Sequence, residues 1–486
     1  MSLARLLEAP LAQVSDRTAL AVSTGQSCSF AELEDVIARC AAALQSADVG
    51  AGDRVAVLDS TGILTAAAVI AAARVGAAAT MMNVHLTAPE LRALAEAAGC
   101  CTVGIAGDTY ADTLADVLHG SVLAAHDINA ATPSPEPSII PAANAEAVVL
   151  FTSGTTTTPK VVAIPTQALE RRLDALALPL DATAPATVRM ICVPLFHVGG
   201  LLGLLRNLRS GVTTVVQQRF DAGEWLRLVE QHRVGGAFLV PTMLRRILDH
   251  PGLGDADLRS LTAITYGAAP APAELIERAV AAMPWVAFSN TFGQTETLGG
   301  ITTLSADDHR NAARIGSVGR PIPGVTIRIV DEEGEDVARG DVGELWVLSP
   351  QNAAPGWIHT GDLVRVDSDG YLYIAGRLRE LINRGGEKFS PDEVEAVLRT
   401  HPLITDVAVA GVPDVEMGER VGVAVVSTAP ISLDDVRAHC RGALARYKLP
   451  ELLVTVDELP VNALGKVVRA RVVELFATAC EQAGAR

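Results

Sequence analysis

The sequence predicts an α/β protein with more than one domain, and three observations support that class. A chain of 486 residues is too long for a single hydrophobic core. Apolar residues make up 49% of it, enough for large buried cores, and its 41 glycines and 26 prolines indicate many short turns. Runs typical of strands alternate with amphipathic stretches typical of helices, which favours a mostly parallel sheet covered on both faces.

Hydrophobic periodicity places the individual elements in chain order. Helices are expected at 29–45, 64–75, 91–98, 166–177 and 224–232. Strands are expected at 55–58, 77–81, 101–105, 148–151, 191–195, 212–217, 237–240 and 261–266. The run 63–82 is the most apolar, but Arg74 and Gly76 interrupt it, so a buried helix followed by a strand is expected there and not a membrane span.

Two helix starts carry the pattern of a capping box, in which a hydroxyl and a carboxylate satisfy free backbone N–H groups. Thr87 with Glu90 predicts one, and Ser390 with Glu393 predicts the other. From residue 316 onwards, short strands between glycine turns predict a β-rich subdomain. The last part of the chain is expected to form a separate α/β lobe.

Charge and cysteine content argue against some partners and sites. The formal net charge of −17 disfavours nucleic acid, whose phosphates attract the opposite sign. Seven cysteines, an odd number with no CxxC pair, indicate neither a disulfide framework nor a structural zinc site. The N-terminus has no apolar segment long enough for a signal peptide, so a soluble cytoplasmic protein is expected.

A hydroxyl-rich loop, FTSGTTTTPK over 151–160, continues the strand expected at 148–151. Its hydroxyls, free backbone and lysine suit a polyanion such as a triphosphate, because N–H and O–H groups donate to phosphate oxygens and an ammonium neutralises charge. Pro159 departs from the Walker pattern, so the loop taken alone fits a polar surface turn equally well. ATP binding is its functional interpretation.

His197 follows the strand expected at 191–195. A histidine at a strand end is commonly a hydrogen-bonded structural residue. Gly199 and Gly200 follow shortly after it and would let another chain or a ligand approach closely, so a functional role is weighed equally with the structural one.

Three later stretches carry candidate functional groups. The turn 267–270 has little side-chain bulk, as a flat ring lying on backbone requires. The stretch 290–297 combines an aromatic ring, hydroxyls and a carboxylate, although an aromatic residue is usually part of a core. Lys466 follows a flexible glycine near the end of the chain, where a lysine is usually a solvated surface residue.

Six motifs occur together and in order: FTSGTTTTPK, PLFH, FGQTE, HTGD, GRLRELINRGGEKFSPDEVE and LPVNALGK. On these motifs the chain resembles the adenylate-forming superfamily, and it is most similar to the acyl-CoA and aryl-CoA synthetases. The resemblance covers essentially the whole sequence. It implies a large N-terminal domain of mixed α/β sheets with a β-rich subdomain (1–378) and a small mobile α+β C-terminal domain (379–486), hinged at Arg379.

The resemblance also implies a role for each matching residue. The residues that would hold the β- and γ-phosphates of ATP are Thr152, Ser153, Gly154, Thr155, Thr156 and Lys160. The other nucleotide contacts would come from Gly267, Ala268 and Phe292 at the adenine, Asp362 and Arg377 at the ribose, and Thr295 at the α-phosphate. Glu296 would bind Mg2+, and the catalytic residues would be Thr295, Glu296, His197 and Lys466.

The implied reaction has two halves. A carboxylate attacks the α-phosphate of Mg·ATP to give acyl-AMP and pyrophosphate, and the thiol of coenzyme A then attacks the activated carbonyl. Two anions must meet in the first half, so cations aimed at the transferring group are required. Lys466 would supply such a charge and leave as the small domain turns, and Gly385 and Gly386 would then line the pantetheine tunnel.

The chain departs from the family pattern in three places. Thr157 and Val161 stand where the family loop has glycine, so the loop is expected to be stiffer and turnover to be affected more than nucleotide binding. Residues 348–356 replace a longer segment, which is expected to change how the two domains meet. Arg379 replaces the commoner aspartate or lysine at the hinge and keeps its polar character, so rotation is expected to survive.

An apolar acid is the expected substrate. Residues 194–204 contain no acid that would pair the ammonium of an amino acid, and an unpaired buried ammonium is costly. Residues 288–291 contain no base for a second carboxylate. The side chains that would line an apolar tunnel, or simply form core, include Leu201, Leu202, Leu239, Val240 and Phe288. A medium or long aliphatic acid is the first expectation and an aromatic acid the second.

Three functions fit these observations. The first is an acyl-CoA synthetase that uses ATP, Mg2+ and coenzyme A. The second is an acyl-AMP ligase that hands its adenylate to a carrier protein. The third is a nucleotide- or acyl-binding protein that has lost catalysis, an interpretation that Thr157 and Val161 motivate. The sequence gives no indication of chain length of the acid or of oligomeric state.

Overall fold

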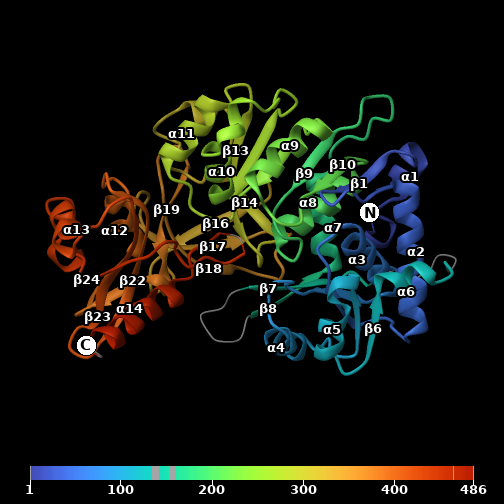
Figure 1. The fold of residues 1–486 in the computed structure, drawn as a ribbon, viewed down its shortest axis with the longest axis horizontal. Helices are drawn as coiled ribbons and strands as arrows, with labels where there is room; N and C mark the ends of the chain where they lie inside the picture. Colours follow the sequence, from blue (N-terminus) through green and yellow to red (C-terminus); the bar gives the residue numbers. More distant parts are fainter. Residues whose placement is uncertain (1, 134–141, 153–159, 464, 485–486) are drawn as a thin grey trace. The chain divides into compact units, whose positions relative to one another are not determined.

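The computed structural model describes residues 2–133, 142–152, 160–463 and 465–484, with side chains up to Ala477. The chain forms two compact units (Figure 1). Unit 1 comprises Met1–Thr326 and Leu348–Ile358, and unit 2 comprises Ile327–Val347 and His359–Arg486. The domain boundary expected after residue 378 falls inside unit 2, and it stays a prediction.

A six-stranded sheet forms one part of unit 1, in the order β6-β5-β3-β4-β7-β8. Its strands are β3 (Arg54–Leu58), β4 (Ala78–Met81), β5 (Val103–Ala106), β6 (Ser121–Ala124), β7 (Glu146–Thr152) and β8 (Lys160–Pro165). All neighbours pair in parallel except β7 and β8, which form an antiparallel hairpin. The helices of this part are α2 (Phe30–Ser46), α3 (Ile63–Val75), α4 (Ala88–Ala98), α5 (Ala111–Val117), α6 (Ala125–Ala130) and α7 (Thr166–Leu176).

A nine-stranded sheet forms the other part of unit 1, in the order β15-β14-β13-β12-β11-β9-β10-β1-β2. Its strands are β1 (Thr18–Val22), β2 (Ser27–Ser29), β9 (Val188–Ile191), β10 (Thr213–Val216), β11 (Gly236–Leu239), β12 (Ala263–Gly267), β13 (Ala287–Gln294), β14 (Gly299–Leu304) and β15 (Arg320–Pro321). The helices are α1 (Glu8–Val14), α8 (Val198–Arg209), α9 (Ala222–His232), α10 (Pro241–Leu248) and α11 (Ala273–Ala282). The strands from β1 to β13 in this order run parallel, and β2, β14 and β15 pair antiparallel at the two edges.

Unit 2 contains two sheets. One has the order β16-β17-β18-β19, from β16 (Thr326–Val330), β17 (Gly343–Leu348), β18 (Ile358–Val366) and β19 (Leu372–Arg377). The other has the order β21-β20-β23-β22, with β24 also on β23, from β20 (Ile382–Arg384), β21 (Glu387–Phe389), β22 (Ile404–Asp414), β23 (Gly418–Ser427) and β24 (Leu452–Thr455). Its helices are α12 (Pro391–Leu398), α13 (Leu433–Cys440) and α14 (Arg469–Gly484).

Local sequence signals predicted most of these elements. Both predicted capping boxes are present, with Thr87 at the start of α4 and Ser390 at the start of α12. The apolar run 63–82 is the helix α3, buried along nearly its whole length, followed by the buried strand β4. Among the described residues, no helix is long and apolar enough to cross a membrane.

The strand expected at 191–195 is wrong. Strand β9 ends at Ile191, which is the last residue that pairs with both β10 and β11. Pro194 has no backbone N–H to donate to a ladder, and the N–H of His197 donates to the Pro194 carbonyl at 3.2 Å. The chain therefore turns over Cys192–His197 instead of continuing the sheet.

Candidate functional site

The carboxyl edge of the nine-stranded sheet gathers several predicted residues. Strands β9, β11, β12 and β13 are parallel neighbours. His197 lies in the turn after β9, and Gly267 ends β12. Phe292 lies near the end of β13, and Glu296 lies two residues beyond that end. Because parallel strands end at one edge, these residues lie at the place where such sheets bind ligands.

The hydroxyl-rich loop is a connection between two paired strand ends. Thr152 ends β7 opposite Lys160, which begins β8. Ser153, Gly154, Thr155, Thr156 and Thr157 lie outside the described residues. Val161 faces Phe151 across the hairpin and packs against the core, so it belongs to the strand and not to the loop.

Lys160 and Glu296 form an ion pair within unit 1. The Lys160 Nζ lies 3.1 Å from the Glu296 Oε1, although 136 residues separate them. The Glu296 side chain is 17% exposed and that of Lys160 is 64% exposed. The two motifs that were expected to share the triphosphate and its metal therefore bring a cation and a carboxylate together.

The side chains present fit a magnesium ion that arrives with its nucleotide. Among the described residues, no group of three or more His, Cys, Asp or Glu side chains gathers to hold a metal. Mg2+ prefers oxygen ligands and is usually held by one or two carboxylates together with substrate phosphates and water. Glu296, a largely shielded carboxylate, would supply a protein ligand of that kind, and this role stays a prediction.

Packing between strands explains the small residue at Gly267. A Cβ built on Gly267 would lie 2.2 Å from the Thr291 carbonyl oxygen on the neighbouring strand β13. Ala268, the next residue, has φ +67°, in the left-handed region that side chains other than glycine rarely adopt. The turn is thus narrow for structural reasons, and the adenine contacts of Gly267, Ala268 and the half-buried Phe292 stay predictions.

His197 is half-buried, and its surroundings disfavour the protonated form. Burial, with a smaller contribution from His85, lowers the pKa of His197 to about 4. Its Nε2 atom has no hydrogen-bond partner in the part of the chain that the structure describes. Gly200 serves the fold: a Cβ there would lie 2.3 Å from the Pro194 carbonyl oxygen, so the close approach at this glycine is by the chain itself.

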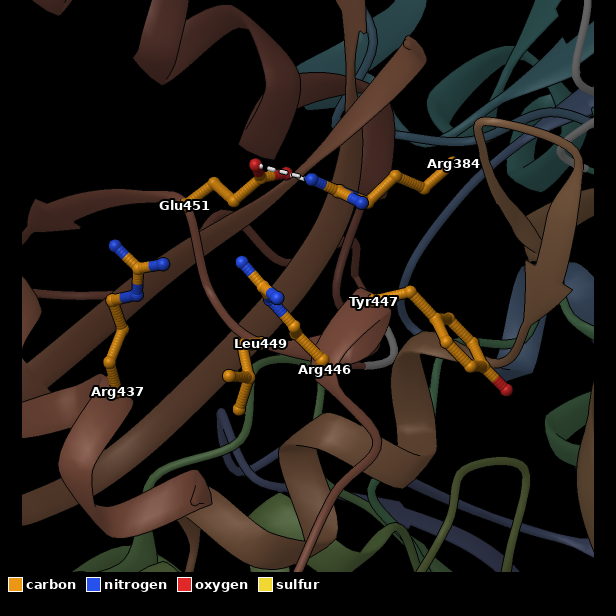
Figure 2. Close-up of a pocket in the computed structure, with 6 residues that line it drawn as sticks. All are labelled: Arg384, Arg437, Arg446, Tyr447, Leu449 and Glu451. Atoms are coloured by element: carbon orange, nitrogen blue, oxygen red, sulfur yellow. Dashed lines mark hydrogen bonds and ion pairs between the residues drawn. The ribbon is translucent and has the colours of Figure 1, made fainter.

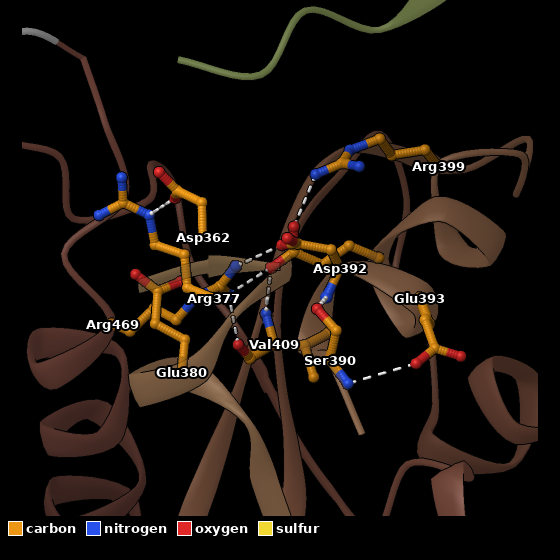
Figure 3. Close-up of polar contacts among 10 residues, drawn as sticks. Asp362, Arg377, Glu380, Ser390, Asp392, Glu393, Arg399, Val409 and Arg469 are labelled. Atoms are coloured by element: carbon orange, nitrogen blue, oxygen red, sulfur yellow. Dashed lines mark hydrogen bonds and ion pairs between the residues drawn. The ribbon is translucent and has the colours of Figure 1, made fainter. Parts of the chain in front are cut away.

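Asp362 and Arg377 form an ion pair in unit 2, and their contact with the ribose stays a prediction. Arg377 Nε lies 2.7 Å from Asp362 Oδ1, and the two residues are opposite each other on β18 and β19 (Figure 3). Burial raises the pKa of Asp362, and the charges of Arg377 and Lys466 oppose that shift.

Lys466 shares this neighbourhood. Burial and the like charge of Arg377 lower its pKa, whereas Glu380 and Asp362 act in the opposite direction. Its backbone N–H donates to Asn462 Oδ1 at 3.1 Å, and its carbonyl accepts from the Asn462 N–H at 2.8 Å. Lys466 is therefore not the solvated surface lysine that its position in the sequence favours.

Arg469 forms ion pairs with three acidic side chains of unit 2. It pairs with Glu380, Asp392 and Glu395, which come from the segment after β19 and from α12 (Figure 3). These three charges raise the pKa of Arg469 although burial opposes them. Arg469 is the first residue of α14, so its ion pair with Glu380 ties the start of this helix to the segment that holds the expected hinge residue Arg379. Lys466 lies three residues before the start of α14.

Gly385 and Gly386 form the two-residue turn of the β20–β21 hairpin. Their φ angles are +59° and +92°, the signature of a type I′ turn, which requires left-handed backbone at both positions. Both glycines are exposed. The turn alone explains the pair of glycines, so their contact with pantetheine stays a prediction.

A cavity of about 440 Å3 in unit 2 carries three arginines. It is lined by Arg384, Arg437, Arg446, Tyr447, Leu449 and Glu451 (Figure 2). Glu451 pairs with Arg384 through two hydrogen bonds of 2.7 and 2.8 Å. Arg437 Nε is buried and has no partner among the residues described. A phosphate would find donors here that Glu451 does not use.

The side chains proposed to line an apolar tunnel are all buried. Their exposed fractions are 2% for Leu201, 6% for Leu202, 0% for Leu239, 1% for Val240 and 2% for Phe288. They are core residues in the structure, and their contact with a substrate stays a prediction.

Sequence patterns did not single out Arg172, Gln351 or Arg469. Arg172 lies on the apolar face of α7 next to Leu169 and Leu173, and an arginine on such a face is a signal that could have been noticed. Gln351 carries no local signal, since only the fold brings it to Arg172.

Comparison with known proteins covers both parts of the chain. The model of the AMP-binding enzyme family matches residues 7–356, and that of the AMP-binding enzyme C-terminal domain matches residues 393–466. A feruloyl-CoA synthase of Amycolatopsis sp is 34% identical, over 93% of this chain and 94% of that protein. The fatty acid–[acyl-carrier-protein] ligase ScoC of Streptomyces coeruleorubidus is 30% identical, over 96% of this chain and 95% of that protein.

The fold agrees with a solved structure of the same kind. The o-succinylbenzoate coenzyme A synthetase MenE of Bacillus subtilis, in complex with ATP and magnesium ion, superimposes with a TM-score of 0.83 at 28% identity. The match covers 96% of this chain and 99% of that chain. The chain therefore belongs to the AMP-binding enzyme family, within the adenylate-forming superfamily that its six motifs resemble.

Proposed function

We propose that this enzyme is an acid–thiol ligase, which activates an apolar carboxylic acid with ATP and transfers the acyl group to coenzyme A. The observation that carries the proposal is the Lys160–Glu296 ion pair, because a cation and a carboxylate side by side at the carboxyl edge of a parallel sheet suit a metal-bound polyphosphate. The family, with CoA ligases among its members, supports the same chemistry.

In the first half-reaction the chain's residues bind and neutralise the nucleotide. Lys160 and the loop after Thr152 hold the terminal phosphates, Thr295 donates to the α-phosphate, and Glu296 binds the metal. Mg2+, when bound, withdraws charge from the phosphate oxygens that the carboxylate must approach. Asp362 accepts from the ribose hydroxyls, and Arg377 keeps that carboxylate oriented through their 2.7 Å ion pair.

Lys466 supplies a further positive charge to the carboxylate and the α-phosphate. Its environment in unit 2, beside Asp362 and Glu380, partly offsets the cost of burying the ammonium. Because phosphoryl-type displacement depends mainly on positioning and charge neutralisation, losing this one cation slows adenylate formation far more than it weakens ATP binding.

Coenzyme A is the proposed acceptor. The arginine-lined cavity of unit 2 offers guanidinium groups for the phosphates of such a thiol and Tyr447 as a face for its base. A carrier protein is the second candidate, because the relative ScoC is named a fatty acid–[acyl-carrier-protein] ligase. The cytoplasmic location expected from the sequence is proposed with it, and the six described cysteines are free, as in a reducing compartment.

A panel of carboxylic acids separates these acceptors. Aliphatic acids of increasing length, cinnamic-type aromatic acids, amino acids and dicarboxylic acids are each incubated with Mg·ATP, and pyrophosphate release and loss of free coenzyme A thiol are measured together. The proposal predicts equal amounts of both with an aliphatic or aromatic acid. Pyrophosphate release without thiol loss would assign the carrier-protein reaction instead.

A further inference from the structure

Arg172 of α7 is a buried cation held by neutral acceptors. The residue is 6% exposed, and burial lowers its pKa to about 10. Its Nη1 donates to Gln351 Oε1 at 3.0 Å and its Nη2 to the Gly300 carbonyl oxygen at 2.9 Å. Its Nε is buried without a hydrogen-bond partner in the described part of the chain. A charge in this state is costly, so packing alone does not account for it.

Both acceptors of Arg172 lead to the loop that carries Glu296. This loop, residues 295–298, joins β13 to β14, and Gly300 is the second residue of β14. Gln351 Nε2 reaches the Thr297 carbonyl at 3.5 Å, and the Ala353 N–H donates to the Glu296 carbonyl at 2.8 Å. The loop is thus held from outside by α7 and by the segment Leu348–Ile358.

The loop needs such support because its backbone is strained. Leu298 has φ +51° and Gly299 has φ +87°. A left-handed conformation is unfavourable for leucine and persists where the surroundings enforce it. Inside the loop, the buried Thr297 hydroxyl accepts from the Gln294 N–H at 3.1 Å, and the Leu298 N–H donates to the Thr295 carbonyl at 3.0 Å.

We infer that Arg172 and Gln351 are positioning residues, which hold the Glu296 carboxylate where it meets the metal of Mg·ATP. The inference rests on the proposed role of Glu296. It also gives the short segment Leu348–Ile358 a function: with Gln351 and Ala353 it fixes the catalytic loop of unit 1. A group acting in this way changes the metal-dependent part of nucleotide binding, whereas a residue that only stabilises the fold does not.

The test compares Arg172→Met with Arg206→Met in the full chain. Arg206 of α8 is a matched control, because its pKa is also lowered to about 10 by burial and its Nε donates to a backbone carbonyl, that of Leu176, at 2.8 Å. Calorimetry gives the Kd of ATP in the presence of Mg2+ and in the presence of a chelator. The metal enhancement is the Kd with the chelator divided by the Kd with Mg2+. Arg172→Met is expected to lower this ratio about tenfold or more, with the chelator value nearly unchanged, and Arg206→Met is expected to keep it.

A second pair of variants keeps the inference falsifiable if Arg172→Met does not fold. Gln351→Leu should lower the metal enhancement as well, and Gln351→Glu should lower it less, because a carboxylate still accepts from Arg172 but no longer donates to the Thr297 carbonyl. An unchanged ratio in both Arg172→Met and Gln351→Leu, or an equal loss in Arg206→Met, overturns the inference. A wild-type protein that binds ATP without any metal enhancement overturns the role of Glu296 as well, whereas acid-dependent pyrophosphate release tests the proposed function separately.

Discussion

At the scale of single residues, burial is the main cause of the pKa shifts of two candidate catalytic residues. His197 and Lys466 are both cationic types whose pKa values are lowered mainly by burial. For His197 the consequence is a neutral side chain at neutral pH, so it can pack or accept a hydrogen bond without adding charge. For Lys466 the neighbouring carboxylates Glu380 and Asp362 oppose the lowering of its pKa.

The lowered pKa of His197 predicts that the folded protein loses stability in acid. Its pKa falls from 6.5 in the unfolded chain to about 4 in the folded protein, so the unfolded state binds more protons between these values. Its contribution to stability is therefore complete above pH 6.5 and declines as the pH falls towards 4. Between pH 7.5 and 5 the free energy of unfolding should fall by about 2 kcal/mol more in the wild type than in His197→Gln.

Denaturant unfolding at the two pH values measures this difference. The exposed His119 provides the control, since His119→Gln should follow the wild type. Equal acid sensitivity of His197→Gln and the wild type would show that His197 is not buried in neutral form.

At the scale of helices and strands, the sequence predicted a feature correctly where the contacts that form it lie within one short segment. The capping boxes at Thr87 and Ser390 were found because each is a contact between residues three apart. The strand at 191–195 was placed wrongly because its apolar side chains are also used in a buried turn, and only pairing with β10 and β11 decides where β9 ends. The Arg172–Gln351 contact joins residues 179 positions apart, which no periodicity reveals.

A substitution in the β20–β21 hairpin tests whether its glycines are required for the turn alone or also for acyl transfer. Gly385→Asn creates the Asn-Gly pair that type I′ turns favour, so the free energy of unfolding should change by less than about 1 kcal/mol. A Cβ at this position meets the terminal methyl of Met417 at 2.7 Å, which is the flexible end of a side chain. If the turn lines the thiol path, the variant keeps adenylate formation and loses acyl transfer to coenzyme A.

The control for this variant is Gly334→Asn, at another left-handed glycine in a turn of unit 2, with φ +85°. Rates of the two half-reactions are measured for both proteins with the same acid. Acyl transfer at the wild-type rate in Gly385→Asn would leave the turn with a purely structural role.

The whole molecule divides the proposed chemistry between its two units. Unit 1 carries the Lys160–Glu296 pair and the clamp of Arg172 and Gln351, and unit 2 carries Lys466 with Asp362 and Arg377. The sequence motifs located every one of these residues except Arg172 and Gln351. The hinge at Arg379 stays a prediction, as does the rotation that exchanges Lys466 for the Gly385–Gly386 turn.

The central claim is that a carboxylate attacks the α-phosphate of ATP with the help of the Lys466 charge. The most direct measurement is exchange of labelled pyrophosphate into ATP, followed across the acid panel for the wild type and Lys466→Ala. We predict acid-dependent exchange in the wild type, its loss in Lys466→Ala, and nearly normal thioester formation by that variant from supplied acyl-AMP. Tight ATP binding without exchange for any acid, or an equal loss of both half-reactions in Lys466→Ala, would contradict the account.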